Sequence, residues 1–204
     1  RCCFVDETGR TGPADLMTAL LAREFRRREP GAHVVYDLRS SWVVKEEIAA
    51  RGGVGHRDRV GHSFIKATMR EHGAVFAGEL SGHFYFRDNW YVDNGMIPAL
   101  VLLERLGRER RRLSEIVAPL RERHHISGEI NSPVADVERA LARLEERYHD
   151  AGIGRLDGIS IDYDDWHFNV RPSNTEPLLR LNLEAGSRET MERRRDEVLA
   201  LIRS

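Results

Sequence analysis

Residues 171–177, with the sequence RPSNTEP, form the segment with the clearest capacity to bind an anion. Arg171 has a planar guanidinium group that can hold a phosphate through two parallel hydrogen bonds. Ser173, Asn174 and Thr175 add hydroxyl and amide donors, and two prolines restrict the backbone of the segment. The pattern predicts a phosphate-binding loop. An ordinary polar turn is the alternative, because turns use the same residue types.

A second polar segment, residues 78–83 (GELSGH), follows a short apolar run. Glu79 and Ser81 are two residues apart, so an extended backbone would direct both side chains to one side. A carboxylate beside a hydroxyl suits the neighbouring hydroxyl groups of a sugar. His83 can donate a hydrogen bond to a substrate or carry a proton. A strand-end turn with a capping glutamate is the alternative for this segment.

Two single residues upstream are weaker candidates. Arg39 follows an apolar run that ends at Asp37, and the carboxyl ends of strands are where open α/β sheets bind ligands. His62 lies at an expected helix start. Taken singly, each of these residue types more often has a surface or capping role, so we assign both to supporting positions.

The overall composition argues against nucleic-acid and membrane partners. The 204 residues include 32 basic and 33 acidic side chains, for a net charge of −1. Nucleic-acid and membrane-surface proteins need a dominant basic field, so we expect neither kind of partner. Cys2 and Cys3 are adjacent and poorly placed to form a disulfide, which indicates a reducing cytoplasm. No apolar run approaches the roughly 18–20 residues of a membrane span, and no signal peptide is visible.

The helices and strands that position these segments are arranged differently in the two halves of the chain. In the first half, apolar residues at helical spacing alternate with short apolar runs, which predicts a largely parallel sheet covered on both faces. Asp93 or Asn94 is expected to cap the last helix of this half, and Gly107 to end it. The expected helices cover residues 16–25, 41–48, 64–69 and 94–107, and the expected strands cover residues 33–37, 74–77 and 83–86.

The second half has its strands clustered between helices, which predicts a small α+β domain. Residues 108–112 (RERRR) are either the edge of a linker or a solvated helix end, and we place the boundary near residues 121–126. Ser187 is expected to cap the last helix. The remaining expected elements are helices over 114–120, 137–148 and 187–202, a hairpin of strands 159–163 and 166–170, and a strand over 178–183.

Together, the two polar segments resemble the α-D-phosphohexomutase superfamily, whose third and fourth domains carry the motifs G-E-x-S-G-H and R-x-S-N-T-x-P. Both motifs occur here in that order, and the resemblance covers essentially the whole chain. It implies a mixed, largely parallel α/β/α sandwich domain followed by a small α+β domain of TBP-like fold. It also implies three parts: residues 1–12 as the tail of metal-binding domain two, 13–122 as domain three, and 123–204 as domain four.

The resemblance assigns roles to individual residues. It implies that Glu79 and Ser81 bind the sugar, with His83 as a candidate acid/base. Arg39 stands where relatives often have lysine, which keeps the charge but changes the geometry. The further implied roles are phosphate binding by Arg171, Ser173, Asn174 and Thr175, a supporting role for His62, and a catalytic role for Arg1 as the last arginine of the metal loop.

The implied reaction interconverts hexose 1-phosphate and hexose 6-phosphate, through a bisphosphorylated sugar and an enzyme phosphoserine. Asn174 favours the phosphomannomutase/phosphoglucomutase type. The nucleophilic serine and the Mg²⁺ ligands are expected upstream of Arg1, so we expect this chain to bind no metal and to be inactive alone. Its expected partners are a hexose phosphate, a hexose 1,6-bisphosphate and the missing domains one and two.

Two other functions fit the same residues. One is a non-catalytic, regulatory protein that binds sugar phosphates, and the other is a phosphoglucosamine mutase, which usually has glycine at the position of Asn174. An upstream reading frame that encodes Asp-x-Asp-x-Asp and a serine-bearing loop would favour the enzyme, whereas a start codon near Arg1 would favour the regulatory protein. Substrate profiling of the intact protein separates the two mutases.

Overall fold

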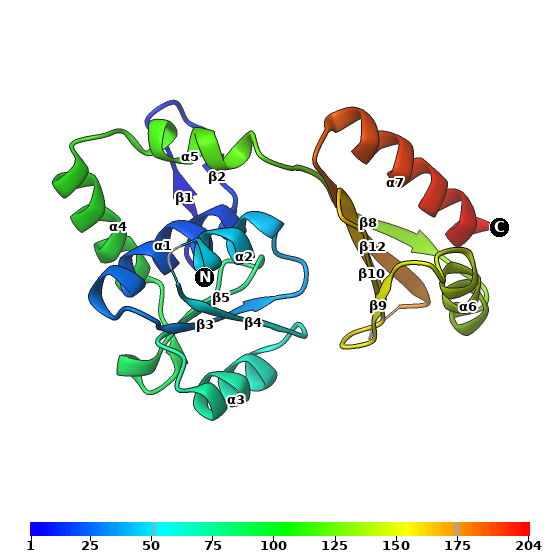
Figure 1. Cartoon of the computed structure of the whole chain (residues 1–204), viewed down its shortest axis with the longest axis horizontal. Helices are drawn as coiled ribbons and strands as arrows, with labels where there is room; N and C mark the ends of the chain where they lie inside the picture. Colours follow the sequence, from blue (N-terminus) through cyan, green and yellow to red (C-terminus); the bar gives the residue numbers. More distant parts are fainter. Residues whose placement is uncertain (51, 174–175) are drawn as a thin grey trace. The chain divides into compact units, whose positions relative to one another are not determined.

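A computed structural model describes residues 1–50, 52–173 and 176–204 (Figure 1). The chain divides into two compact units, Arg1–Arg123 and His124–Ser204, and each has its own hydrophobic core. No helix in the described ranges combines the length and the apolar character needed to cross a bilayer.

The first unit contains a five-stranded sheet in the order β4-β3-β5-β6-β7. Strands β4, β3 and β5 are parallel, and β6 is antiparallel to both of its neighbours. The expected mixed, largely parallel sheet is therefore confirmed. The strands are β3 (His33–Asp37), β4 (Val54–Asp58), β5 (Phe76–Gly78), β6 (Phe84–Phe86) and β7 (Val92–Asp93).

Helices cover both faces of this sheet, with α1 and α2 on one face and α3 on the other (Figure 1). Successive residues of a strand point to opposite faces of the sheet. Val34 packs in the larger core with α1, whereas Val35 packs in the smaller core with Ile65 and Met69 of α3. The helices of this unit are α1 (Ala14–Arg28), α2 (Trp42–Ala49), α3 (His62–His72), α4 (Met96–Glu109) and α5 (Leu113–Arg121), and a short hairpin of β1 (Phe4–Val5) and β2 (Thr11–Gly12) precedes them.

The predicted end of α4 at Gly107 is wrong. The helix continues to Glu109 and ends at Arg110, which has a positive φ of 51°. Ion pairs hold the additional turn in place, because Arg105 lies 3.1 Å from Glu109 and Arg108 lies 2.8 Å from the buried Glu24 of α1. At the other end of α4, the side chain of Asn94 accepts the backbone N–H groups of residues 96 and 97, as one of the two expected caps.

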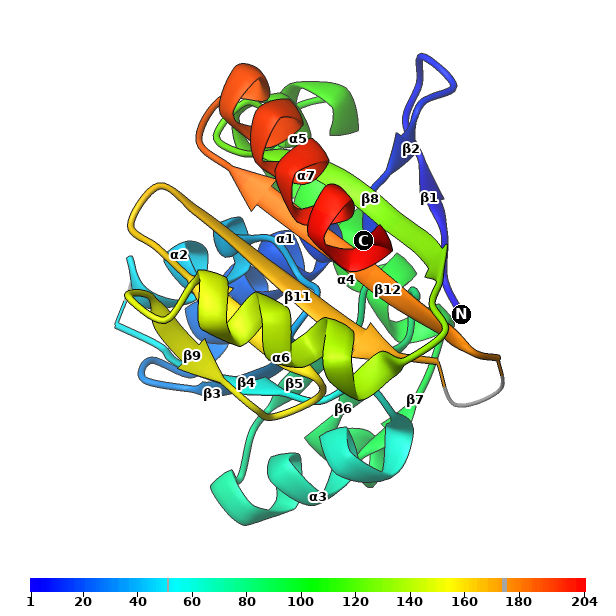
Figure 2. The ribbon, with the colours of Figure 1, turned by 90° about the vertical axis from the view of Figure 1, so that its right-hand side faces the viewer.

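The second unit is a five-stranded antiparallel sheet in the order β8-β12-β11-β10-β9, with both helices on one face (Figure 2). Phe168 and Leu181 point into the core beneath the helices, and the alternate residues place polar side chains on the opposite face. The expected α+β class is confirmed. The elements are β8 (His125–Pro133), α6 (Val137–Arg147), β9 (Gly152–Gly154), β10 (Ile159–Asp162), β11 (Trp166–Pro172), β12 (Leu178–Ala185) and α7 (Arg188–Arg203).

Candidate functional site

The polar loop of the first unit begins where β5 meets α1. A Cβ atom placed on Gly78 would lie 2.1 Å from the Oγ1 atom of Thr18, which is itself buried. Only glycine allows this close approach of helix and strand. The packing of α1 therefore fixes the point at which residues 79–83 leave the sheet.

A tight turn brings the side chains of this loop together. Gly82 has a φ of 81° and donates its N–H to the carbonyl of Glu79, and the N–H of Glu79 donates to the carbonyl of His83. Ser81 Oγ donates to Glu79 Oε2 at 2.8 Å and lies 2.8 Å from His83 Nδ1. The side chains of Glu79 and Ser81 lie close together, as expected. The expected reason, an extended backbone, is wrong, because residues 80 and 81 form a turn.

Two histidines and a tyrosine continue this cluster. The rings of His62 and His83 are 4.6 Å apart edge to face, and the Tyr85 hydroxyl lies 2.7 Å from His62 Nδ1. Burial and the nearby Glu79 carboxylate raise the pKa of Tyr85 far above its usual value, so the phenol stays protonated and can donate to His62.

The pKa of His83 is lowered, first by burial and then by the charge of His62, whereas Glu79 opposes the shift. A His62→Gln substitution should therefore raise the pKa of His83, because it removes a charge that disfavours protonation. A Glu79→Gln substitution should lower the same pKa, because it removes a carboxylate that favours protonation. An NMR pH titration of the His83 imidazole measures both shifts, and two shifts of the same sign would contradict this description of the cluster.

Asp37 connects the end of β3 to this loop. One carboxylate oxygen, Oδ2, accepts hydrogen bonds from Arg39 Nη2 and from the backbone N–H of Leu80, both at 2.8 Å. The other oxygen accepts the backbone N–H of Arg39 at 2.9 Å. Arg39 thus lies next to the loop through Asp37, a residue that the sequence motifs do not single out.

The N-terminal residues also contact the loop. The backbone N–H of Cys2 donates to the carbonyl of Gly82 at 2.8 Å, and the charge of Arg1 contributes to the lowered pKa of His83. Arg1 therefore lies in the electrostatic surroundings of His83. Its catalytic role remains a prediction.

In the second unit, two arginines meet at the end of a hairpin. Arg171 on β11 is directly opposite Arg180 on β12. Both contact the carboxylate of Glu129, at 3.0 Å for Arg171 Nη2 and 3.5 Å for Arg180 Nη1, and Arg180 also donates to Ser173 Oγ at 3.2 Å. Two guanidinium groups and a hydroxyl in one place form an arrangement suited to a phosphate dianion.

Arg180 lies outside the predicted phosphate-binding segment, residues 171–177, although the sequence contains a signal for it. Arg180 alternates with the apolar residues of the strand over 178–183, and it is about as far from the turn as Arg171 is. Two of the predicted phosphate ligands, Asn174 and Thr175, lie outside the described residues.

The resemblance implies a Mg²⁺ ion whose ligands are expected upstream of Arg1. Within the described ranges, the one group of at least three potential metal ligands consists of His33, His56 and His72. Mg²⁺ prefers oxygen ligands, so these nitrogen donors do not fit it.

Comparisons with known proteins match both units. Residues 13–124 match the family model for the α/β/α domain III of phosphoglucomutase/phosphomannomutase, and residues 129–201 match the one for its C-terminal domain. A phosphomannomutase of Methanocaldococcus jannaschii is 43% identical over 202 residues, and one of Escherichia coli is 40% identical over 205 residues. Each match covers 99% of this chain but only 45% of the relative, so the chain spans less than half of their length.

Two solved structures have a fold similar to that of this chain. A phosphoglucomutase/phosphomannomutase family protein from Burkholderia thailandensis superposes with a TM-score of 0.85 at 29% identity, over 98% of this chain and 43% of that one. An N-acetylphosphoglucosamine mutase from Aspergillus fumigatus, solved with glucose 1,6-bisphosphate, shares the fold, with a TM-score of 0.68 at 14% identity over 98% of this chain and 45% of that one.

Proposed function

Because this chain belongs to the phosphoglucomutase/phosphomannomutase family, we propose that it is the sugar- and phosphate-binding half of an enzyme that interconverts hexose 1-phosphate and hexose 6-phosphate. The sugar is glucose or mannose, and the reaction passes through a hexose 1,6-bisphosphate and an enzyme phosphoserine. We place the reaction in the cytoplasm, where the two unpaired cysteines stay reduced. The observation that carries the proposal is the meeting of Arg171, Arg180 and Ser173 at one point.

The second unit holds the phosphate that is not being transferred. Arg171 and Arg180 offer N–H groups that match phosphate oxygens, and Ser173 adds a hydroxyl. Asn174 and Thr175 complete the set by resemblance. Because these groups contact the phosphate rather than the sugar, the same loop serves either orientation of the substrate.

The first unit holds the sugar. Glu79 accepts hydrogen bonds from ring hydroxyls, and Ser81 both donates and accepts. His83 is the acid/base: its lowered pKa favours the neutral imidazole, which can accept a proton from the substrate and return it. Arg39 and His62 support this loop, and Arg1 acts next to His83. The Mg²⁺ ligands are expected in the upstream domains, and an ion held there would offset charge at the transferring phosphoryl group.

An NMR titration of this chain with glucose 1-phosphate, mannose 1-phosphate and glucosamine 1-phosphate tests the proposal. We expect backbone shifts at residues 79–83 and at residues 171–173 with the glucose and mannose ligands. Inorganic phosphate should shift only the second set. A stronger response to the glucosamine ligand would favour a phosphoglucosamine mutase, and no response in either set with any sugar phosphate would refute the proposal.

The catalytic assignment needs a separate assay. This chain alone, mixed with glucose 1-phosphate and Mg²⁺, should give no glucose 6-phosphate, because the resemblance assigns the phosphoserine and the Mg²⁺ ligands to the upstream domains. Substantial turnover by the chain alone would contradict the division of roles that we propose.

A further inference from the structure

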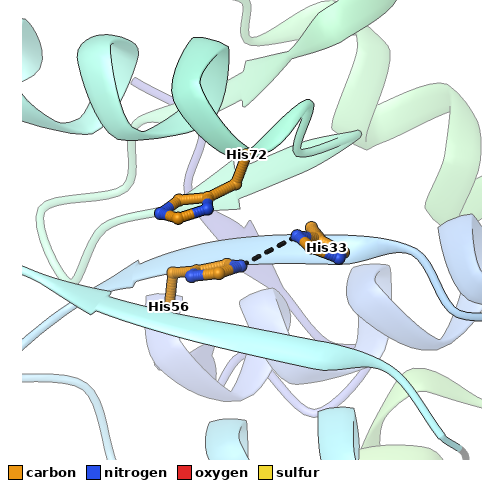
Figure 3. Close-up of side chains that lie close together, drawn as sticks. All are labelled: His33, His56 and His72. Atoms are coloured by element: carbon orange, nitrogen blue, oxygen red, sulfur yellow. Dashed lines mark hydrogen bonds between the residues drawn. The ribbon is translucent and has the colours of Figure 1, made fainter.

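Three histidines from separate elements meet at one edge of the first unit (Figure 3). His33 Nδ1 and His56 Nε2 lie 3.0 Å apart, and the rings of His56 and His72 stack with their centroids 3.9 Å apart. One ring nitrogen from each residue lies within 4.8 Å of those of the other two. His33 and His56 are partly buried and His72 is exposed, so the cluster is accessible from solvent.

The pairing of β3 with β4 and the packing of α3 on the sheet bring the three histidines together. His33 begins β3, and His56 lies on the adjacent parallel strand β4, opposite Val35. His72 is the last residue of α3, which packs on the same face of the sheet as Val35. The sequence separations of 23 and 16 residues follow no standard metal motif, so only the tertiary structure reveals the cluster.

The cluster is separate from the site proposed above. His33 is at the start of β3, whereas Asp37 and Arg39 are at its carboxyl end, and four residues of strand span about 13 Å. On α3, His72 is ten residues from His62, which is about 15 Å along a helix. The two groups of histidines therefore lie at opposite ends of the same helix.

We propose that His33, His56 and His72 together bind one transition-metal cation of the zinc class, with water at the remaining coordination position. Three imidazole nitrogens are a ligand set that suits Zn²⁺, Cu²⁺ or Ni²⁺ and not Mg²⁺ or Ca²⁺. Tetrahedral zinc with Zn–N bonds near 2.0–2.1 Å places its nitrogens about 3.4 Å apart. Metal binding would bring the ring nitrogens, now within 4.8 Å of one another, to that spacing, and would turn the rings of His56 and His72 out of their stacked arrangement.

Two features place negative charge near the cluster. His72 lies at the C-terminal end of α3, where the helix dipole is negative. The carboxylate of Glu71 is near enough to act on His56. Burial and the two neighbouring imidazoles lower the pKa of His56, which favours the neutral ring that a metal requires.

A bound metal would join the end of α3 to β3 and β4. Since a ligand that binds only the folded state stabilises it, Zn²⁺ should raise the midpoint of thermal unfolding of the first unit in a concentration-dependent manner. Mg²⁺ at the same concentrations should leave the midpoint unchanged, because it does not suit nitrogen ligands.

Calorimetry with ZnCl₂ on the whole chain tests the proposal. We expect one Zn²⁺ per chain, and loss of this binding in the His72→Gln and His56→Gln variants. His149→Gln is the matched control, because His149 is an exposed histidine of the second unit, and this variant should bind as the unchanged chain does. Unchanged zinc affinity in both cluster variants, or no binding by the unchanged chain, would overturn the proposal.

A second measurement needs no substitution and so does not depend on how a variant folds. Substoichiometric Cu²⁺ should broaden the imidazole NMR signals of His33, His56 and His72 in the unchanged chain. Broadening confined to His62 and His83 would instead assign the metal to the cluster around residues 79–83 and would overturn the proposal.

Discussion

An Arg171→Ala substitution should weaken the binding of glucose 1-phosphate to this chain by about 1.5–3 kcal/mol, the usual range for a hydrogen bond to a charged group. The side chain lies opposite Arg180 and shares the carboxylate of Glu129 with it. Removing Arg171 deletes one of two guanidinium groups from the proposed phosphate site. Calorimetry with the sugar phosphate measures the loss.

The matched control is Arg195→Ala, since Arg195 is in the same unit but pairs with Asp196 on α7. This variant loses one positive charge, as Arg171→Ala does, and should keep the affinity of the unchanged chain. Arg180→Ala should weaken binding to a similar extent as Arg171→Ala. Equal affinities for the Arg171→Ala and Arg195→Ala variants would mean that only the overall charge matters, and the phosphate assignment of the loop would fail.

A Gly158→Ala substitution should destabilise the second unit by about 2–4 kcal/mol, from the cost of a left-handed backbone and of overpacking. Gly158 has a φ of 63°, and an added Cβ would lie 2.2 Å from the carbonyl oxygen of Val170 and 2.6 Å from the Cα of Arg171. Both obstacles are backbone atoms, so no side-chain rotation can relieve the contact. Hydrogen exchange of peptides from β10 and β11 measures the effect within this unit.

Gly128→Ala separates the two causes. Gly128 has a φ of 73° in the same unit, but an added Cβ there would have no atom within 4 Å. This variant should show only the backbone cost, about 1–2 kcal/mol. If both variants lowered the free energy of unfolding equally, the close approach of Gly158 to β11 would not contribute to the loss of stability.

The elements with a strong hydrophobic pattern could be predicted from the sequence. The strand over 33–37 and the hairpin of β10 and β11 were found because their apolar residues form short, uninterrupted or alternating runs. Strand β4 (VGHRD) was missed, because this edge strand has almost no apolar side chains and is held by its pairing with β3. Its register is a tertiary property that no local pattern contains.

The candidate site was predictable to the extent that it lies within contiguous segments. Glu79, Ser81 and His83 fall within six residues, and the structure brings all three together. Asp37 was missed as a site residue because its role depends on a hydrogen bond to Leu80, 43 positions later. The three clustered histidines could not be predicted for the same reason, since two strands and a helix must assemble before they meet.

The hydrogen bonds within the loop of residues 79–83 also affect the thermodynamics of ligand binding. Glu79, Ser81 and His83 hold one another, and Asp37 fixes the adjacent backbone before any ligand arrives. Preorganisation of this kind moves the loss of conformational entropy from binding to folding. A hexose that meets this loop should therefore bind without an ordering step in it.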